Sequence, residues 1–219
     1  MATVLDLAIV SVFDSLQAFS NQDNIWDLLA IPFGENYDRA RAGALWEQWQ
    51  TGVGVLPTIE VIDDEVLGAA QGAYSIETDT IYLRENFVAN ADQGDLVRVL
   101  LEEYGHFVDA QVNGVDSPGD EGAIFAAIVI GKSLSESELA LLQSENDRGV
   151  VTIDGVNTEV EMDIVDPGNT RAEALDLGTF NYSLTPPLAI PVLQEYLDSV
   201  GGGDSDDYFK FSLDATRNI

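Results

Sequence analysis

The chain contains no cysteine and a single histidine, His106. Without cysteine it cannot form a disulfide framework, a thiolate zinc site or a cysteine nucleophile. A single imidazole also excludes every metal or catalytic site that takes two histidines from one chain.

Basic residues are scarce as well, with 9 Lys and Arg against 39 Asp and Glu and a formal net charge of −30. Such a charge repels nucleic-acid backbones and anionic lipid surfaces, so we expect neither nucleic acid nor membranes as partners. It attracts cations, and calcium above all, because hard divalent ions prefer oxygen ligands.

Long apolar runs are also missing, and none approaches the length of a membrane span. Residues 1–19 are apolar and periodic, but they lack a basic region and contain Asp6 and Asp14, so we expect no signal peptide. The 219 residues, 46% hydrophobic and 22% charged, are typical of a globular chain of one or two domains.

Apolar periodicity predicts helices and strands in irregular alternation. We expect helices over residues 4–19, 36–49, 95–112, 121–130 and 135–144. We expect strands over residues 56–62, 73–76, 80–83, 150–153 and 156–162, with Asp154-Gly155 as the turn of the last hairpin. This mixture without regular βαβ units favours an α+β domain over residues 1–165.

The composition changes after this domain. Residues 166–169 are linker-like, and the alternation of residues 208–213 predicts a strand. We therefore expect residues 166–219 to open an all-β module that needs more chain than is present. Because the sequence stops in this pattern, we expect it to be a piece of a longer protein.

One helix combines residues that can carry chemistry. Glu102, His106 and Asp109 occupy positions i, i+4 and i+7, which share a helix face. The pattern Glu-Glu-x-x-His differs from the zinc-protease helix His-Glu-x-x-His only at its first residue. In that motif the two histidines bind metal and the intervening glutamate, here Glu103, is the general base.

A carboxylate can replace a histidine as a zinc ligand, so we expect Glu102, His106 and a third oxygen ligand to hold a metal ion. Glu121, at the start of the next expected helix, is the first candidate for the third ligand, with Asp109 and Asp120 as alternatives. The added carboxylate makes metal-bound water less acidic and shifts the preference toward harder ions. The alternative is an ordinary Glu102–His106 side-chain pair on a helix surface.

Four segments resemble a known family: Pro57-Thr58-Ile59-Glu60-Val61, Gly72-Ala73-Tyr74 with Thr80-Ile81-Tyr82-Leu83, Leu100-Leu101-Glu102-Glu103-Tyr104-Gly105-His106, and Gly119-Asp120-Glu121-Gly122-Ala123-Ile124-Phe125. Their order is similar to that of gluzincin metalloproteases and of bacterial zincin-like domains in secreted calcium-binding proteins with hemolysin-type repeats. The resemblance implies a small mixed sheet packed on an active-site helix, a zinc ion, and a peptide or protein substrate. The departure at Glu102, where those enzymes have histidine, bears on catalysis rather than on the fold.

The tail resembles a second family. Asn169-Thr170, Ala174-Leu175-Asp176-Leu177-Gly178 and the segment from Gly203 to Phe211 look like the start of a bacterial pre-peptidase C-terminal domain. That family is a β-sandwich appended to secreted peptidases, so the resemblance implies an extracellular location. Asp204, Asp206 and Asp207 are close enough in sequence to bind calcium, or they form a solvated acidic turn.

Two functions remain as hypotheses. The first is a secreted metal-dependent hydrolase, a peptidase that activates metal-bound water with Glu103 as general base. The alternative is a catalytically inactive zincin-like structural module of a larger extracellular calcium-binding protein, which the replaced histidine and the acidity favour. The acidity alone also fits an adaptation for solubility or salt.

Overall fold

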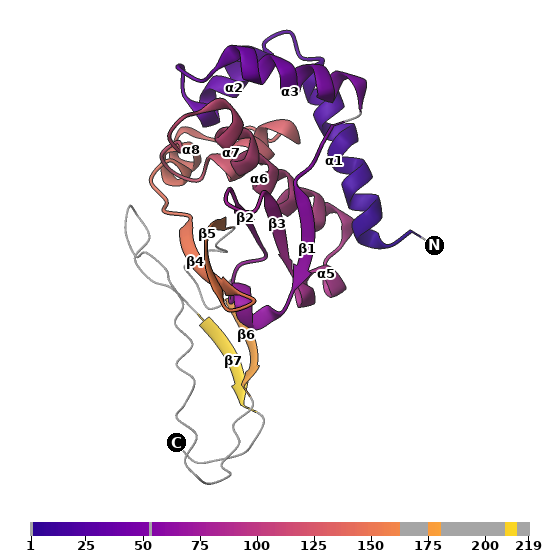
Figure 1. Ribbon diagram of the computed structural model, residues 1–219, viewed down its shortest axis with the longest axis vertical. Helices are drawn as coiled ribbons and strands as arrows, with labels where there is room; N and C mark the ends of the chain where they lie inside the picture. Colours follow the sequence, from indigo (N-terminus) through magenta and orange to yellow (C-terminus); the bar gives the residue numbers. More distant parts are fainter. Residues whose placement is uncertain (1, 53, 163–174, 181–208, 214–219) are drawn as a thin grey trace. The chain divides into compact units, whose positions relative to one another are not determined.

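A five-stranded mixed sheet and the helices packed on it form the first part of the chain (Figure 1). The computed structural model describes residues 2–52, 54–162, 175–180 and 209–213. It divides into two compact units, residues 1–163 and residues 164–219. The mixture of helices and strands confirms the α+β class, and the division lies close to the expected boundary after residue 165.

The sheet has the strand order β1-β3-β2-β5-β4, in which β1 and β3 are parallel and the other neighbours are antiparallel. Asp79 turns the first hairpin with φ 51°, and Asp154 and Gly155 turn the second with φ 52° and 79°. Short polar residues and glycine tolerate this left-handed region, so the Asp-Gly turn forms where it was expected. The strands are β1 Thr58–Ile62, β2 Gly72–Ser75, β3 Thr80–Arg84, β4 Arg148–Ile153 and β5 Val156–Met162.

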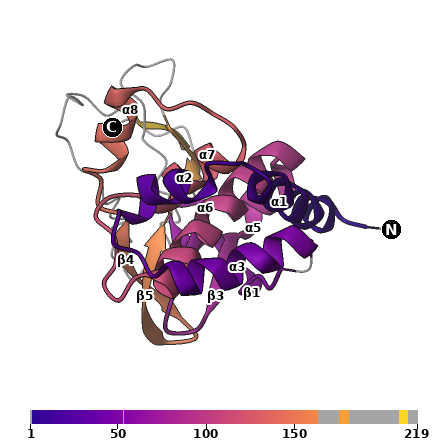
Figure 2. The same cartoon turned by 90° about the horizontal axis from the view of Figure 1, so that it is seen from above.

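Helix α6 occupies the centre of the first unit. It begins after Asp92, whose side chain accepts a hydrogen bond from the backbone N–H of Asp95 and so caps the helix. It packs against β2, β3 and β5 and against α1, α3 and α7 (Figures 1 and 2). The helices are α1 Val4–Ser20, α2 Ile25–Phe33, α3 Arg39–Thr51, α4 Asp64–Leu67, α5 Glu85–Asn90, α6 Gln93–Val112, α7 Glu121–Val129 and α8 Glu136–Leu142.

Helix α2 was not expected from the sequence. Seven of its nine residues are apolar and Pro32 lies within it, so it shows neither a polar face nor an unbroken helical pattern. The next helix begins later than expected, because Asp38 caps α3 by accepting hydrogen bonds from the N–H groups of Ala40 and Arg41. The capping box of Ser135 and Glu138 at the start of α8 is present as expected.

The core of the first unit is an aromatic cluster around Phe125 of α7. Its ring centroid lies 6.0 Å from Phe19, 5.6 Å from Phe33, 6.0 Å from Trp49 and 6.3 Å from Tyr104. The indole N–H of Trp49 donates a 2.9 Å hydrogen bond to the hydroxyl oxygen of Tyr104 on α6. Helices α1, α2 and α3 therefore belong to the same core as α6 and α7.

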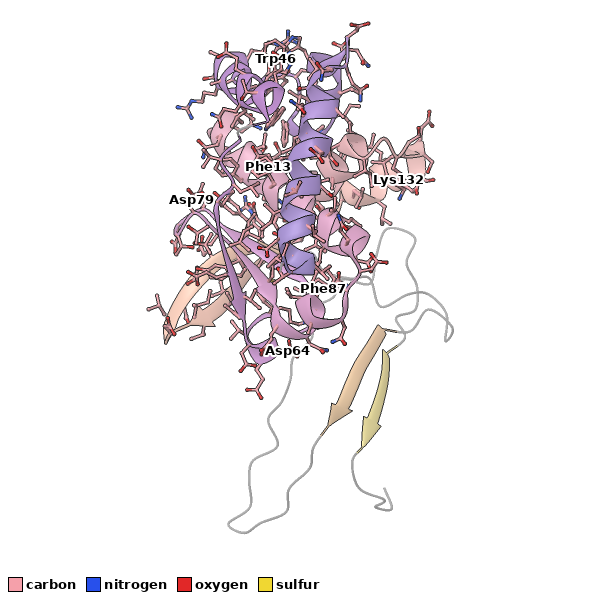
Figure 3. The ribbon with its side chains drawn as sticks, turned by 90° about the vertical axis from the view of Figure 1, so that its right-hand side faces the viewer. Phe13, Trp46, Asp64, Asp79, Phe87 and Lys132 are labelled. Carbon is pink, nitrogen blue, oxygen red and sulfur yellow. The ribbon has the colours of Figure 1, made fainter. Side chains whose placement is uncertain are left out.

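Helix α1 runs along the face of this unit from near Trp46 to near Phe87 (Figure 3). At one end, the Trp46 indole N–H donates to the backbone carbonyl of Ser20, at 2.9 Å. Further along, Gln93 at the start of α6 donates to the hydroxyl of Ser11, at 2.8 Å. These contacts fix α1 to the domain along its length.

The second unit is described by strands β6 Leu175–Phe180 and β7 Phe209–Leu213, which pair in parallel. The all-β module expected over residues 166–219 stays a prediction, and the expected linker at 166–169 and the acidic residues Asp204, Asp206 and Asp207 lie outside the described residues. None of the helices in the described part of the chain combines the length and the apolar character that crossing a bilayer requires.

Replacing Phe125 by alanine tests this core. The side chain is fully buried, so Phe125→Ala leaves a cavity and should lower the free energy of unfolding by about 3 to 5 kcal/mol. Denaturant unfolding measures the change. Ile76→Ala, at a residue that is 64% exposed, is the control and should change it by no more than about 0.5 kcal/mol. Equal effects of both variants would contradict the assigned core.

Candidate metal centre

The imidazole of His106 is completely buried and faces three carboxylates. Its Nδ1 lies 2.9 Å from Oε1 of Glu121, 3.4 Å from Oε2 of Glu161 and 3.9 Å from Oδ2 of Asp147. We call these four residues the His106 centre. One ring nitrogen thus lies at the meeting point of carboxylate oxygens from separate parts of the chain.

Four elements of the fold supply these side chains. His106 lies in the middle of α6, and Glu121 is the first residue of α7. Asp147 immediately precedes β4, and Glu161 lies on β5, where it pairs in register with Tyr74 of β2. The centre therefore exists only when the β4–β5 hairpin is docked on α6 and α7.

Capping orders the start of α7. Asp120 is the N-cap residue, and its Oδ1 accepts a hydrogen bond from the N–H of Ala123, at 2.6 Å. Glu121 is then in the first turn, where the helix dipole stabilises a negative charge. Of these two neighbouring acids, Asp120 therefore caps α7 and Glu121 contributes its carboxylate to the His106 centre.

Asp109 orders the connection between α6 and α7. Its Oδ1 accepts hydrogen bonds from the hydroxyl of Ser117, at 2.6 Å, and from the amide of Asn113, at 2.7 Å. Its Oδ2 accepts from the backbone N–H of Ser117, at 3.1 Å. This network holds the loop in the shape that returns α7 to the His106 face of α6.

The carboxyl groups of the His106 centre have raised pKa values. Burial raises the pKa of Asp147 from 3.8 to about 7 and that of Glu161 from 4.5 to about 8, although the charge of His106 opposes both shifts. Burial raises the pKa of Glu121 too, again against His106. For His106, burial lowers the pKa, but the carboxylates of Glu121, Glu103 and Asp120 together outweigh it and hold the value well above 6.5.

The spacing of the ligand atoms suits a single ion. With metal–ligand distances near 2.1 Å, neighbouring ligand atoms lie about 3.0 Å apart in an octahedron and about 3.4 Å apart in a tetrahedron. In the metal-free protein His106 Nδ1 and Glu121 Oε1 form a 2.9 Å hydrogen bond, and Glu161 Oε2 lies 3.4 Å from the same nitrogen, so all three atoms are within the span of one coordination shell. Among the described residues, three groups of ligand atoms lie within 4.8 Å of one another: His106, Glu121 and Glu161; His106, Asp120 and Asp147; and Asp109, Asp116 and Glu121.

The structure brings together two of the three metal ligands expected from the sequence, His106 and Glu121. The third, Glu102, is buried and accepts a 2.8 Å hydrogen bond from Nη1 of Arg98, and it belongs to none of the three groups. The alternatives Asp109 and Asp120 each belong to one group. The ligand role of Glu102 stays a prediction.

Glu103, the expected general base, is completely buried against β2. A Cβ added to Gly72 would lie 2.6 Å from its Oε1, so the glycine makes room for the carboxylate. The charge of Glu103 also raises the pKa of His106. Glu103 therefore acts electrostatically on the His106 centre.

Sequence reasoning missed Asp147 and Glu161. Glu161 alternates with the buried residues Val160 and Met162 in β5, which is typical of a solvent-facing position. Asp147 stands just before a strand, where acidic residues are common in turns. No local signal distinguishes these two acids from the many others in the chain.

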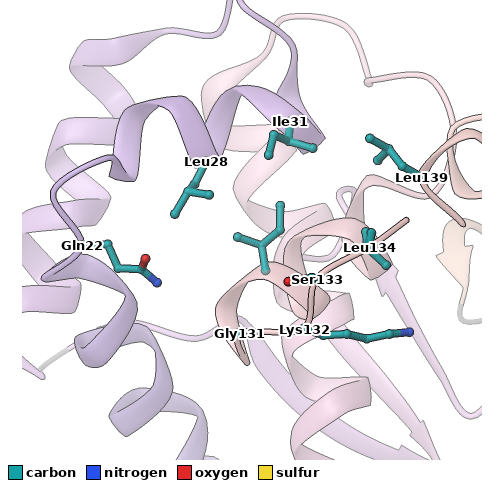
Figure 4. Close-up of a pocket in the computed structure, with 9 residues that line it drawn as sticks. Gln22, Leu28, Ile31, Gly131, Lys132, Ser133, Leu134 and Leu139 are labelled. Atoms are coloured by element: carbon teal, nitrogen blue, oxygen red, sulfur yellow. The ribbon is translucent and has the colours of Figure 1, made fainter. Parts of the chain in front are cut away.

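A separate hollow of about 310 Å³ lies between the end of α1, α2, the end of α7 and α8 (Figure 4). Lys132 is the one charged residue in its lining, and its Nζ lies 3.6 Å from Oε1 of Glu138. With neither carboxylate nor imidazole in its lining, it offers no metal site. The lining residues are Gln22, Leu28, Ile31, Ile128, Gly131, Lys132, Ser133, Leu134 and Leu139.

The raised pKa values predict how the metal-free domain responds to pH. Carboxyl groups with a higher pKa in the folded state stabilise the fold when protonated, and this contribution is lost as the pH rises through about 7 and 8. The free energy of unfolding should therefore fall between about pH 5 and pH 9, by a few times the roughly 1.4 kcal/mol that corresponds to one pKa unit.

Denaturant unfolding with a chelator present measures this fall. Glu161→Gln should flatten the profile, because the amide does not titrate, whereas Glu159→Gln at an exposed position of the same strand should not. Stability that rises over this range would contradict the assignment.

Comparison with known proteins assigns no family to the chain. No family model matches it, and neither a curated protein nor a solved structure does so. The His106 centre is therefore defined by the geometry and electrostatics of its own side chains.

Proposed function

We propose that the first unit is a metal-binding domain that holds one divalent cation in the His106 centre. The observation that carries the proposal is the convergence of Glu121, Glu161 and Asp147 on a single buried nitrogen of His106. One imidazolium leaves the other carboxyl groups to be neutralised by protons, as the raised pKa values of Asp147 and Glu161 indicate, because unbalanced buried charge is costly. A divalent ion bound to the same atoms supplies positive charge in place of these protons.

Two oxygens of this centre support the proposal directly. Oε2 of Glu121 and Oδ2 of Asp147 are buried and have no hydrogen-bond partner among the described residues. A buried carboxylate oxygen without a donor normally indicates an ion or water in the native protein. A cation bound beside His106 would provide a partner for such an oxygen.

The burial of the ligands favours a structural role for the ion. His106 and Glu121 are completely buried, Asp147 is 6% exposed, and the Glu161 side chain is 20% exposed at the edge of the centre. Structural zinc sites are closed by protein ligands, whereas catalytic sites keep a position open for water. An ion that joins α6, α7, the segment before β4 and β5 contributes its binding free energy to the stability of the domain.

The donor set favours zinc over calcium at this centre. An imidazole nitrogen suits zinc, whereas calcium takes six to eight oxygen ligands at longer distances. We therefore assign zinc to the His106 centre and keep calcium as the partner of exposed acidic groups elsewhere in the chain. The charge of −30 supports calcium association of that kind.

Zinc titration of variants tests the proposed ligands. His106→Ala and Glu161→Gln should each weaken zinc binding by about a hundredfold or more, beyond the usual effect of losing a group outside the ligand shell. Glu159→Gln is the matched control on the same strand and should leave the affinity unchanged. Calorimetric titration against a competing chelator measures the zinc affinity of all three variants.

Glu102→Gln distinguishes the His106 centre from the ligand set predicted from the sequence, which includes Glu102. We expect little change, because Arg98 holds the Glu102 carboxylate. A loss as large as that of His106→Ala, with Glu161→Gln unaffected, would instead support the set of Glu102, His106 and Glu121. If neither the unmodified protein nor any of the variants binds zinc stoichiometrically, the proposed metal-binding function is refuted.

A second candidate function is metal-dependent hydrolysis of a peptide or protein. The observation that favours it is the position of Glu103, which lies one turn before His106 on α6 and whose charge raises the pKa of His106. A bound ion would lower the pKa of a water molecule, and Glu103 would accept its proton. The resemblance to zincin-like domains supports the same reaction and an extracellular location.

Casein hydrolysis decides between the two functions. If the domain is a hydrolase, zinc-loaded protein should cleave casein and Glu103→Gln should lower the rate by about a hundredfold or more without loss of bound zinc. If the domain is the inactive module of a larger extracellular calcium-binding protein, the zinc-loaded protein cleaves nothing. Glu103→Gln that retains full activity would exclude Glu103 as the base.

A further inference from the structure

Helices α6 and α7 touch at a pair of glycines beside His106. A Cβ added to Gly105 would lie 2.7 Å from Cα of Gly122, a distance that real side chains do not adopt. A Cβ added to Gly122 would lie 2.6 Å from Nε2 and 2.7 Å from Cε1 of His106. The imidazole therefore packs with one edge directly against the backbone of α7.

The two ring nitrogens consequently have different surroundings. Nδ1 faces the carboxylates of Glu121, Glu161 and Asp147, whereas Nε2 faces Gly122 and has no hydrogen-bond partner among the described residues. In this orientation of the ring, Nδ1 and not Nε2 faces the carboxylates.

We propose that the metal ion is bound by Nδ1 of His106 and that Gly122 is the positioning residue that imposes this choice. The inference rests on the proposed metal-binding function. By lacking a side chain, Gly122 lets the ring lie against α7, and this packing presents Nδ1 to the ion. The neutral ring then keeps its proton on Nε2, since a metal-bound nitrogen carries none.

Because the chain has a single histidine, nuclear magnetic resonance can read this choice without ambiguity. The full chain, labelled with ¹⁵N-histidine, is compared with and without one equivalent of zinc in long-range ¹H–¹⁵N correlation spectra. We expect the Nδ1 signal to move to the metal-bound range and Nε2 to remain protonated. A metal-bound Nε2 would overturn the assignment and leave the metal-binding function intact. If zinc binds to neither nitrogen, both proposals fail.

Two pairs of variants test the positioning role. Gly122→Ala should weaken zinc binding by about tenfold to a hundredfold and alter the Nε2 signal. Gly43→Ala on helix α3 is the matched control, because an added Cβ there meets nothing within 4 Å. It should change neither the zinc affinity nor the Nε2 signal. Unchanged zinc affinity and spectra in Gly122→Ala would overturn the role of Gly122.

If Gly122→Ala fails to fold, substitutions of the histidine itself still decide the matter. The side-chain amide of asparagine reaches the position of Nδ1, whereas that of glutamine reaches the position of Nε2. His106→Asn should therefore retain more zinc affinity than His106→Gln in the same competition assay. The reverse order would overturn the Nδ1 assignment.

Discussion

Negative charge gathered around one imidazole is the constraint on which the structure depends. Six acidic residues of the described chain, Glu102, Glu103, Asp109, Asp120, Glu121 and Asp147, are buried, and Glu161 is partly so. Arg98 pairs with Glu102 and Asp109 accepts three hydrogen bonds, whereas the three carboxyl groups of the His106 centre share one imidazole and the more distant charge of Arg148. Such a cluster folds only when protons or a cation neutralise it, so ion binding, pH response and stability are one coupled property.

The parts of the fold that depend on local sequence could be predicted. Helix α6, the Asp154-Gly155 hairpin and the Ser135 cap follow from periodicity and short-range hydrogen bonding, and the contact of His106 with Glu121 follows from two consecutive helices. Asp147 and Glu161 could not be predicted, because they reach the site through long-range strand pairing: β5, which carries Glu161, pairs with β2, and β4, which follows Asp147, pairs with β5. Helical spacing placed Glu102 on the His106 face, but it could not show that Arg98 already holds its carboxylate.

The N-terminal helices are part of the hydrophobic core of the domain. Phe19, Phe33 and Trp49 come from α1, α2 and α3, and all three pack on Phe125 of α7. Phe125 lies four residues after Glu121, so the aromatic core and the Glu121 carboxylate of the His106 centre share the short helix α7. Packing on one side of this helix thus fixes the position of the carboxylate at its start.

The location of Glu161 near the end of β5 has a mechanical consequence. The last sheet pairings of this strand are Tyr74 with Glu161 and Ala73 with Met162, directly before the second unit begins. Tension transmitted along the chain from the second unit would reach the sheet first at these two residues. An ion held by Glu161 and His106 would add coordination bonds to this short stretch of sheet, so the centre would serve as an anchor against pulling.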